Sequence, residues 1–196
     1  MPEALDIIAR FLDDAGARVQ RAGAWPEQLD MARELGPTTG GLVALHQRFG
    51  PGEGSDAEPL TWRGRALSSI ADALASRDRM NHVMKVLRAD GEVDETWWSA
   101  SWLPVFEIDA ASAYCLDLST GEVVKWANDV PERTVEAPSL EAWLGVIAIA
   151  ARSGLLTWEP NGMGLSLDYQ LDPRVDQWFD ALQRLALPGF PKRLGA

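Results

Sequence analysis

Residues 97–144 read WWSASWLPVFEIDAASAYCLDLSTGEVVKWANDVPERTVEAPSLEAWL, and their apolar runs alternate with turn residues. The apolar or alternating runs predict three strands, at 102–106, 112–118 and 122–126. The Ser-Thr-Gly sequence at 119–121 supplies the turn between the second and third runs, and two strands joined in this way form a hairpin. The segment therefore predicts a stretch of antiparallel sheet.

A helix is expected directly after this sheet segment. Ser139 precedes apolar residues that recur at helical spacing, namely Leu140, Trp143, Leu144 and Ile147. A serine in this position caps the free backbone N–H groups of the first helical turn. Gly154 predicts the end of the helix, because glycine readily adopts the left-handed backbone conformation found there.

Apolar residues at helical spacing also predict four helices before the sheet segment. Their inner faces are formed by Leu5, Ile8, Leu12, Ala15 and Val19; by Leu29, Ala32 and Leu35 after Pro26; by Leu42, Leu45 and Phe49; and by Ile70, Ala73, Leu74, Val83, Met84 and Leu87. Ser68 or Ser69 is expected to cap the fourth helix. Residues 60–63 are expected to form a short edge strand ahead of it.

Further elements are expected near the C-terminus. Residues 155–158 and 165–169 flank turn residues and predict a late hairpin. Asp172 is expected to cap a last helix whose inner stripe is Val175, Trp178, Phe179, Leu182 and Leu185. Helices come first, strands cluster in the middle and helices return, so the chain is predicted to be an α+β domain. It should contain a central, mostly antiparallel sheet with flanking helices and an N-terminal helical segment.

The composition narrows the classes of partner. The 196 residues have the length of one domain, and the formal net charge is −11. An acidic surface repels nucleic acid and anionic membranes, so neither is expected as a partner. A basic protein partner is favoured instead, although the same charge also serves simply to keep a protein soluble.

The single cysteine and the apolar windows bear on cellular location. Cys115 is alone, so no intramolecular disulfide is expected, and on a strand it should behave as a small buried hydrophobe. The N-terminus lacks the basic region and apolar core of a signal peptide. The most apolar window, 143–156, is too short to cross a bilayer. A cytoplasmic protein is therefore expected.

Three ordered blocks resemble the SUKH superfamily, which includes the yeast killer-toxin-resistance regulator of cell-wall assembly and bacterial immunity proteins against polymorphic toxins. The blocks are PEQLDMARELGPTTGGLVALHQRFGPGEG at 26–54, LTWRGRALSSIADAL at 60–74, and WLPVFEIDAASAYCLDLSTGEVVKWANDVPE from Trp102 with APSLEAWL after it. The resemblance covers residues 26–156. Residues 1–25 are expected to be an N-terminal helical extension of a single domain, and 157–196 a C-terminal hairpin and helix.

The resemblance implies a protein-binding function without catalysis. The expected function is an immunity protein that binds and neutralises a toxin, whose basic domain would be the partner. The alternative from the same family is an intracellular regulator or scaffold of the cell-wall assembly type. The sequence leaves the oligomeric state open.

Few residues of the sequence are candidates for catalysis. His46 and His82 are isolated, each expected to be a partly exposed helix residue, and with Cys115 they make no clustered zinc-ligand set. A small hydrolase using Asp109 or Asp117 is the remaining enzymatic alternative, because two carboxylates in different environments can act as acid and base. Asp117 precedes Ser-Thr-Gly, so it is more simply interpreted as a turn former. No catalytic residue, metal or cofactor is therefore predicted.

The partner contacts are expected among the acids and tryptophans around the sheet segment. Tryptophan is enriched at binding hot spots, but most of the nine tryptophans should fill the core, with Trp143 and Trp178 on inner helix faces. Trp97 and Trp98 are adjacent, so at least one should be more exposed. The predicted contact residues are Asp90, Glu92, Asp94, Glu95, Trp97, Trp98, Asp109, Asp129 and Glu132. A solvated loop face is the competing interpretation for each of these acids.

Overall fold

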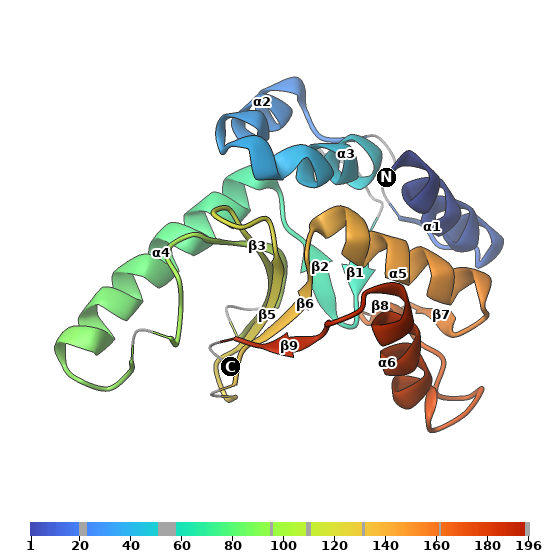
Figure 1. Cartoon of the computed structure of the whole chain (residues 1–196). Helices are drawn as coiled ribbons and strands as arrows, with labels where there is room; N and C mark the ends of the chain where they lie inside the picture. Colours follow the sequence, from blue (N-terminus) through green and yellow to red (C-terminus); the bar gives the residue numbers. More distant parts are fainter. Residues whose placement is uncertain are drawn as a thin grey trace.

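Helices cover both faces of one large sheet in the computed structural model, which describes residues 1–19, 23–50, 58–94, 96–108, 111–130, 132–160 and 162–194 (Figure 1). The strand order is β7-β8-β1-β2-β3-β4-β5-β6-β9. Neighbouring strands pair antiparallel except β1 and β8, which are parallel. The strands are β1 (Thr61–Trp62), β2 (Arg65–Leu67), β3 (Trp102–Ile108), β4 (Ser112–Asp117), β5 (Val123–Ala127), β6 (Thr134–Ala137), β7 (Leu156–Glu159), β8 (Gly164–Leu167) and β9 (Lys192–Arg193).

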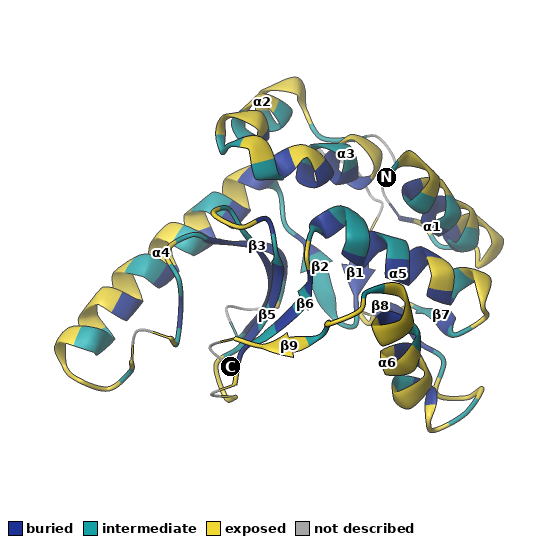
Figure 2. Cartoon of the chain, viewed as in Figure 1, coloured by how far each residue is buried: buried dark blue, intermediate teal, exposed yellow. Residues whose placement is uncertain are grey.

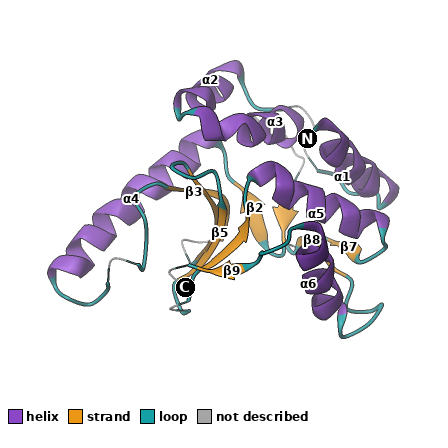
Figure 3. Cartoon of the chain, viewed as in Figure 1, coloured by secondary structure: helices purple, strands orange, loops and turns teal. Residues whose placement is uncertain are grey.

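The helices lie on opposite sides of this sheet. Figure 1 shows α1, α5 and α6 on one side and α4 on the other, and Figure 3 shows the same separation by secondary structure. The helices are α1 (Pro2–Asp14), α2 (Pro26–Glu34), α3 (Gly40–Phe49), α4 (Ile70–Ala89), α5 (Leu140–Arg152) and α6 (Val175–Ala186), with a 3-10 turn, η1, at Pro37–Thr39. The predicted α+β class, with its mostly antiparallel sheet and N-terminal helical segment, is confirmed.

Strands β3, β4 and β5 lie between two apolar cores, which we call the main core and the second core. Side chains alternate along β4, so Tyr114 and Leu116 enter the main core while Ala113 and Cys115 enter the second core. Cys115 is fully buried, as predicted, and burial raises the pKa of its thiol well above the usual value. Bulges interrupt the pairing in β3, at Val105, and in β6, at Glu136, and they allow neighbouring residues there to change face.

Trp143 of α5 lies at the centre of the main core. Its ring centroid is 5.0 Å from that of Tyr114, 5.7 Å from that of Phe106 and 5.9 Å from that of Trp62. The predicted cap of α5 is confirmed, because the Ser139 hydroxyl accepts a 3.1 Å hydrogen bond from the Ala142 backbone N–H. The buried side chains of α1 belong to this same core, so the N-terminal helix packs against the rest of the chain.

Two N-terminal predictions were wrong. Val19 does not continue the first helix, which ends at Asp14; it makes an isolated parallel bridge with Glu58 instead. Residues 60–63 do not form an edge strand, because β1 lies between β8 and β2 in the interior of the sheet. The sequence did not reveal β2, which follows a two-residue turn. Both turn residues have positive φ, 49° at Arg63 and 81° at Gly64, whereas Asn-Gly is the usual pair in such turns.

The last helix, α6, begins later than its apolar periodicity indicates. Fewer of its apolar side chains are buried than this periodicity predicts. Its first residue is Val175, and Asp172 stabilises the preceding turn by accepting a 2.7 Å hydrogen bond from the Arg174 backbone N–H. Trp178 and Leu185 were expected on the inner stripe, but they are 39% and 81% exposed. Only Val175, Phe179 and Gln183 of α6 are buried, so only part of its apolar face is covered, and Figure 2 shows the rest of the helix open to solvent.

A partly buried carboxylate, that of Glu136, lies where α6 meets the sheet. The Gln183 side-chain amide donates to the Glu136 backbone carbonyl at 2.8 Å and to Glu136 Oε2 at 3.2 Å. Burial raises the pKa of the Glu136 carboxyl, and this effect exceeds the opposing contributions of Gln183 and Lys125. Folding therefore favours the protonated form. The protonated Glu136 carboxyl therefore contributes fully to the free energy of unfolding when the pH is below its unfolded-state pKa of about 4.3. This contribution is lost as the pH rises through the folded-state pKa.

Replacing Glu136 with glutamine should therefore stabilise the protein at neutral pH. We expect the free energy of unfolding of Glu136→Gln to exceed that of the unmodified chain by about 1 kcal/mol at pH 7, with the difference vanishing near pH 4. Urea denaturation at both pH values measures this. Glu132→Gln, at an exposed position, is the control and should change little at either pH. Equal stabilities of Glu136→Gln and the unmodified chain at pH 7 would contradict the expectation.

Candidate functional site

Three tryptophans form the centre of the second core. The Trp98 ring lies 5.6 Å from the Trp102 ring and 5.5 Å from the Trp126 ring, both in edge-to-face geometry. Each indole N–H donates a hydrogen bond: from Trp98 to Asn81 Oδ1, from Trp102 to Asp117 Oδ2, and from Trp126 to the Trp97 carbonyl. Trp98 is 1% exposed, so its side chain has no surface to offer a partner. It is a core residue that secures the loop after α4.

Trp97 and Arg133 join two loops at the surface. Trp97 is half-buried, so it is the more exposed of the adjacent pair, as expected. The Arg133 guanidinium carbon lies 4.7 Å from the centroid of the Trp97 ring and 5.8 Å from that of Trp126. Its Nε donates to the Trp97 carbonyl at 3.0 Å, and its Nη1 donates to the Val130 carbonyl. The loop after α4 and the loop between β5 and β6 are therefore held together through one side chain.

Arg133 is almost completely buried, and this shapes its electrostatics. Burial lowers the pKa of Arg133, while the charge of Asp94 acts to raise it. Its Nη2 atom is buried without a hydrogen-bond partner among the described residues. Sequence reasoning missed this residue. The available signal was its place as the one basic side chain in the acidic run 128–136.

Three of the predicted contact acids lie on the two loops that this arginine joins. Asp94, Asp129 and Glu132 are all exposed, and we call them the acidic edge. Asp94 accepts hydrogen bonds from the Thr96 hydroxyl at 2.6 Å and from its backbone N–H at 2.8 Å, and these bonds lower the pKa of Asp94. Glu132 Oε1 lies 3.3 Å from Arg193 Nη1 in an exposed ion pair. The edge thus combines fixed negative charge with one partly exposed aromatic ring.

The remaining predicted acids are not part of this edge. Asp90 and Glu92 are exposed at the projecting end of α4 (Figure 1). Glu95 and Asp109 lie outside the described residues. The structure therefore brings together a subset of the sequence-predicted residues and places Asp90 and Glu92 just after the C-terminal end of α4.

The histidines have different environments. His46 was expected to be partly exposed, but it is buried, and its two ring nitrogens lie 3.0 Å from the Leu42 carbonyl and 2.9 Å from the Ser68 carbonyl. Burial lowers the pKa of His46 despite these contacts. It therefore connects α3 to the segment before α4. His82, in contrast, is exposed on α4.

Of the two carboxylates considered for catalysis, Asp109 lies outside the described residues, and Asp117 lies far from Glu107, the described carboxylate on β3 closest in sequence to Asp109. Asp117 pairs with Trp102 at one end of the β3–β4 ladder, whereas Glu107 pairs with Ala113 near the other. Asp117 accepts hydrogen bonds from the Ser119 hydroxyl and backbone N–H at 2.6 and 2.8 Å, which agrees with its interpretation as a turn former. Burial acts to raise the pKa of Asp117, but its hydrogen bonds outweigh burial and lower it.

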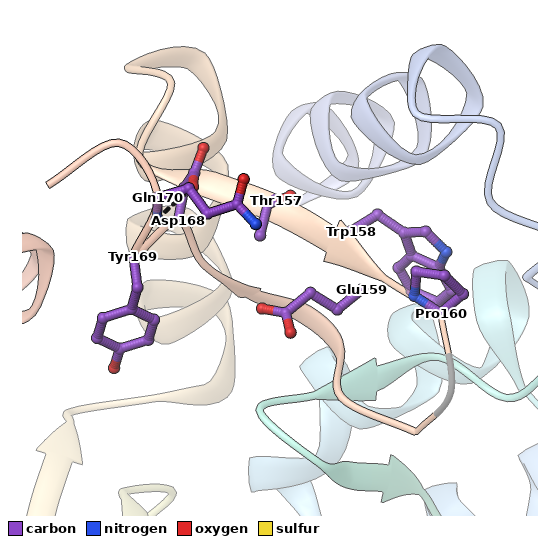
Figure 4. A pocket seen from close by; sticks show the side chains of 7 residues that line it. All are labelled: Thr157, Trp158, Glu159, Pro160, Asp168, Tyr169 and Gln170. Atoms are coloured by element: carbon purple, nitrogen blue, oxygen red, sulfur yellow. Dashed lines mark hydrogen bonds between the residues drawn. The ribbon is translucent and has the colours of Figure 1, made fainter. Parts of the chain in front are cut away.

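Two hollows lie away from the acidic edge. One, of about 520 Å³, opens beside the outermost strand β7, as Figure 4 shows; it is lined by Thr157, Trp158, Glu159, Pro160, Asp168, Tyr169 and Gln170. Asp168, which lines this hollow, accepts hydrogen bonds from the backbone N–H groups of Gln170 and Leu171. The other, of about 530 Å³, lies between α4 and the sheet, where Ser76 donates to Glu107 at 2.7 Å. Neither contains a predicted contact residue.

Within the described ranges, no group of three or more His, Cys, Asp or Glu side chains is placed to hold a metal ion. No helix in the described part of the chain is long and apolar enough to cross a membrane. No protein-family model matches the chain, and no curated protein matches it.

Proposed function

We propose that this chain is a non-enzymatic protein-binding module, an immunity protein that neutralises a toxin by binding its basic domain. The observation that carries the proposal is the acidic edge, where exposed carboxylates flank the half-buried Trp97 on two loops joined by Arg133. The ordered resemblance of residues 26–156 to the SUKH superfamily supports the same function. The net charge of −11 adds a long-range negative electrostatic field, which attracts a basic partner.

The chemistry of such an edge suits capture of a cationic surface. Carboxylates complementary to a basic cleft accelerate encounter and orient the partner, while rim charges add little to the final affinity. Trp97 offers apolar area without a large entropic cost on binding, because Arg133 already stacks on its ring. The partner would therefore be recognised by a positive patch with an apolar centre.

The first experiment identifies the partner by co-purification of the tagged chain from its native host, followed by mass spectrometry. The proposal requires a basic protein domain that loses its toxicity when the chain is bound. Absence of any retained protein, or a partner whose activity is unchanged in the complex, would refute it.

Association with this partner should depend strongly on salt and on the acidic edge. We expect the triple variant Asp94→Asn, Asp129→Asn, Glu132→Gln to lower the association rate constant about tenfold at low salt, with a smaller effect on dissociation. Raising the salt concentration should remove most of the difference, because exposed charges are screened. Stopped-flow or surface plasmon resonance measures both rate constants.

A matched variant separates local steering from net charge. Glu27→Gln, Asp30→Asn, Glu34→Gln removes the same charge from the exposed side of α2, at the other end of the molecule (Figure 1). It should reduce the association rate constant much less. Equal reductions by the two triple variants would assign the effect to overall charge and remove the acidic edge from the interface.

A further inference from the structure

Helix α4 exposes apolar residues that the core does not explain. Val83 was expected on the inner face, but it is 39% exposed, and Val86 is 48% exposed. The inner face of this half of the helix is instead formed by Met80 and Met84, which pack in the second core. Figure 2 shows that the C-terminal half of α4 projects with most of its surface open to solvent.

These valines belong to a regular stripe along the helix. Arg79, Val83, Val86 and Asp90 are separated by four, three and four residues, and all four are exposed. Residues at this spacing lie on one side of an α-helix and form the contact seam of paired helices. The stripe therefore has an apolar centre with a basic residue at one end and an acidic residue at the other.

The order of residues in the stripe is self-complementary. The midpoint between Val83 and Val86 is also the midpoint between Arg79 and Asp90 along the sequence. A two-fold axis at this midpoint would place each valine against the other valine of a second copy. It would also place each arginine against an aspartate, as an isologous interface requires.

We propose that α4 pairs antiparallel with α4 of a second copy of this chain, through Arg79, Val83, Val86 and Asp90. Within the described part of the chain, neither Arg79 nor Asp90 has an ion-pair partner, so both are available to a second copy. Asp90 is thereby assigned to the dimer contact and not to the toxin. The inference goes beyond the proposed function and does not depend on it, because the acidic edge is not part of the stripe.

The interface is expected to be small. The stripe spans about three turns, roughly 16 Å of helix, so it buries less than a standard protein interface. A reversible dimer that forms at micromolar concentrations or above is the expected state. Because the contact includes two symmetry-related ion pairs, reversing one charge creates two repulsive contacts.

Charge exchange tests this geometry. Sedimentation velocity from about 5 to 500 μM should show a concentration-dependent monomer–dimer equilibrium. Arg79→Asp and Asp90→Arg should each raise the dimer dissociation constant at least about tenfold. The double variant Arg79→Asp, Asp90→Arg should restore dimerisation, because the exchanged charges again pair across the axis.

The controls distinguish this contact from general charge effects and from misfolding. The pair Asp78→Arg, Lys85→Asp lies on another side of the same helix and should leave the dissociation constant within about threefold. Circular dichroism should be unchanged for all variants, since every substituted residue is exposed. A chain that stays monomeric at 500 μM, or a double variant that fails to recover, would overturn the proposal. Loss of toxin binding in Arg79→Asp without any dimer would instead assign the stripe to the toxin.

Discussion

Replacing Trp98 with alanine should lower the free energy of unfolding by about 3–5 kcal/mol, the range for truncating a large buried aromatic side chain. The substitution removes two edge-to-face ring contacts, with Trp102 and Trp126, from the centre of the second core. It also leaves Asn81 Oδ1 without the indole N–H that donates to it at 2.8 Å. Since native domains are commonly stable by only 5–15 kcal/mol, this variant should be close to unfolding at physiological temperature.

Equilibrium denaturation in urea, followed by circular dichroism, measures this loss. Trp178→Ala is the matched control, because the same residue type there is 39% exposed on α6, and its cost should stay below about 1 kcal/mol. Similar costs for the two variants would contradict the structural role of Trp98. The comparison also bears on binding, because a hot-spot tryptophan costs affinity when truncated, whereas this one should cost stability first.

Replacing Arg133 with alanine should lower the free energy of unfolding by about 2–4 kcal/mol. The guanidinium donates to the Trp97 and Val130 carbonyls and covers the Trp97 ring, so its removal breaks these hydrogen bonds and opens a gap beside the ring. Among the described residues, the Trp97 carbonyl then keeps only the hydrogen bond from the Trp126 indole N–H. Arg133→Lys should recover little, because an ammonium cannot reproduce the planar stacking and the divergent N–H groups.

The loops that Arg133 joins should also become more accessible. Native-state hydrogen exchange is expected to accelerate in the loop after α4 and in the loop between β5 and β6, while the main core around Trp143 keeps its protection. Arg193→Ala is the control, since that side chain is 73% exposed in its ion pair with Glu132 and should change stability little. An Arg133→Ala protein with unchanged stability and exchange would show that the loops hold their positions without this residue.

Local patterns in the sequence were sufficient to predict β3, β4 and β5 and the helix α5 that follows the sheet segment, but not β2 or β6. The alternation in β4, the Gly-containing turn before β5 and the serine cap of α5 each act within a few residues, so they are readable without tertiary information. The α+β class followed from the order of these elements. The positions of the acidic loops could also be predicted, because turn residues and charged residues favour exposed backbone whatever the tertiary packing.

Only the tertiary structure decided which of these residues reach solvent. Periodicity shows which side chains share a helix face, but not whether the sheet extends far enough to cover that face. Val83 and Trp178 are therefore exposed although their spacing indicates burial. Trp98 is buried for the converse reason, since a loop residue becomes core when a helix and a sheet close over it. Arg133 contacts Trp97, 36 residues away in the sequence, and no local pattern encodes a contact that exists only after the sheet has formed.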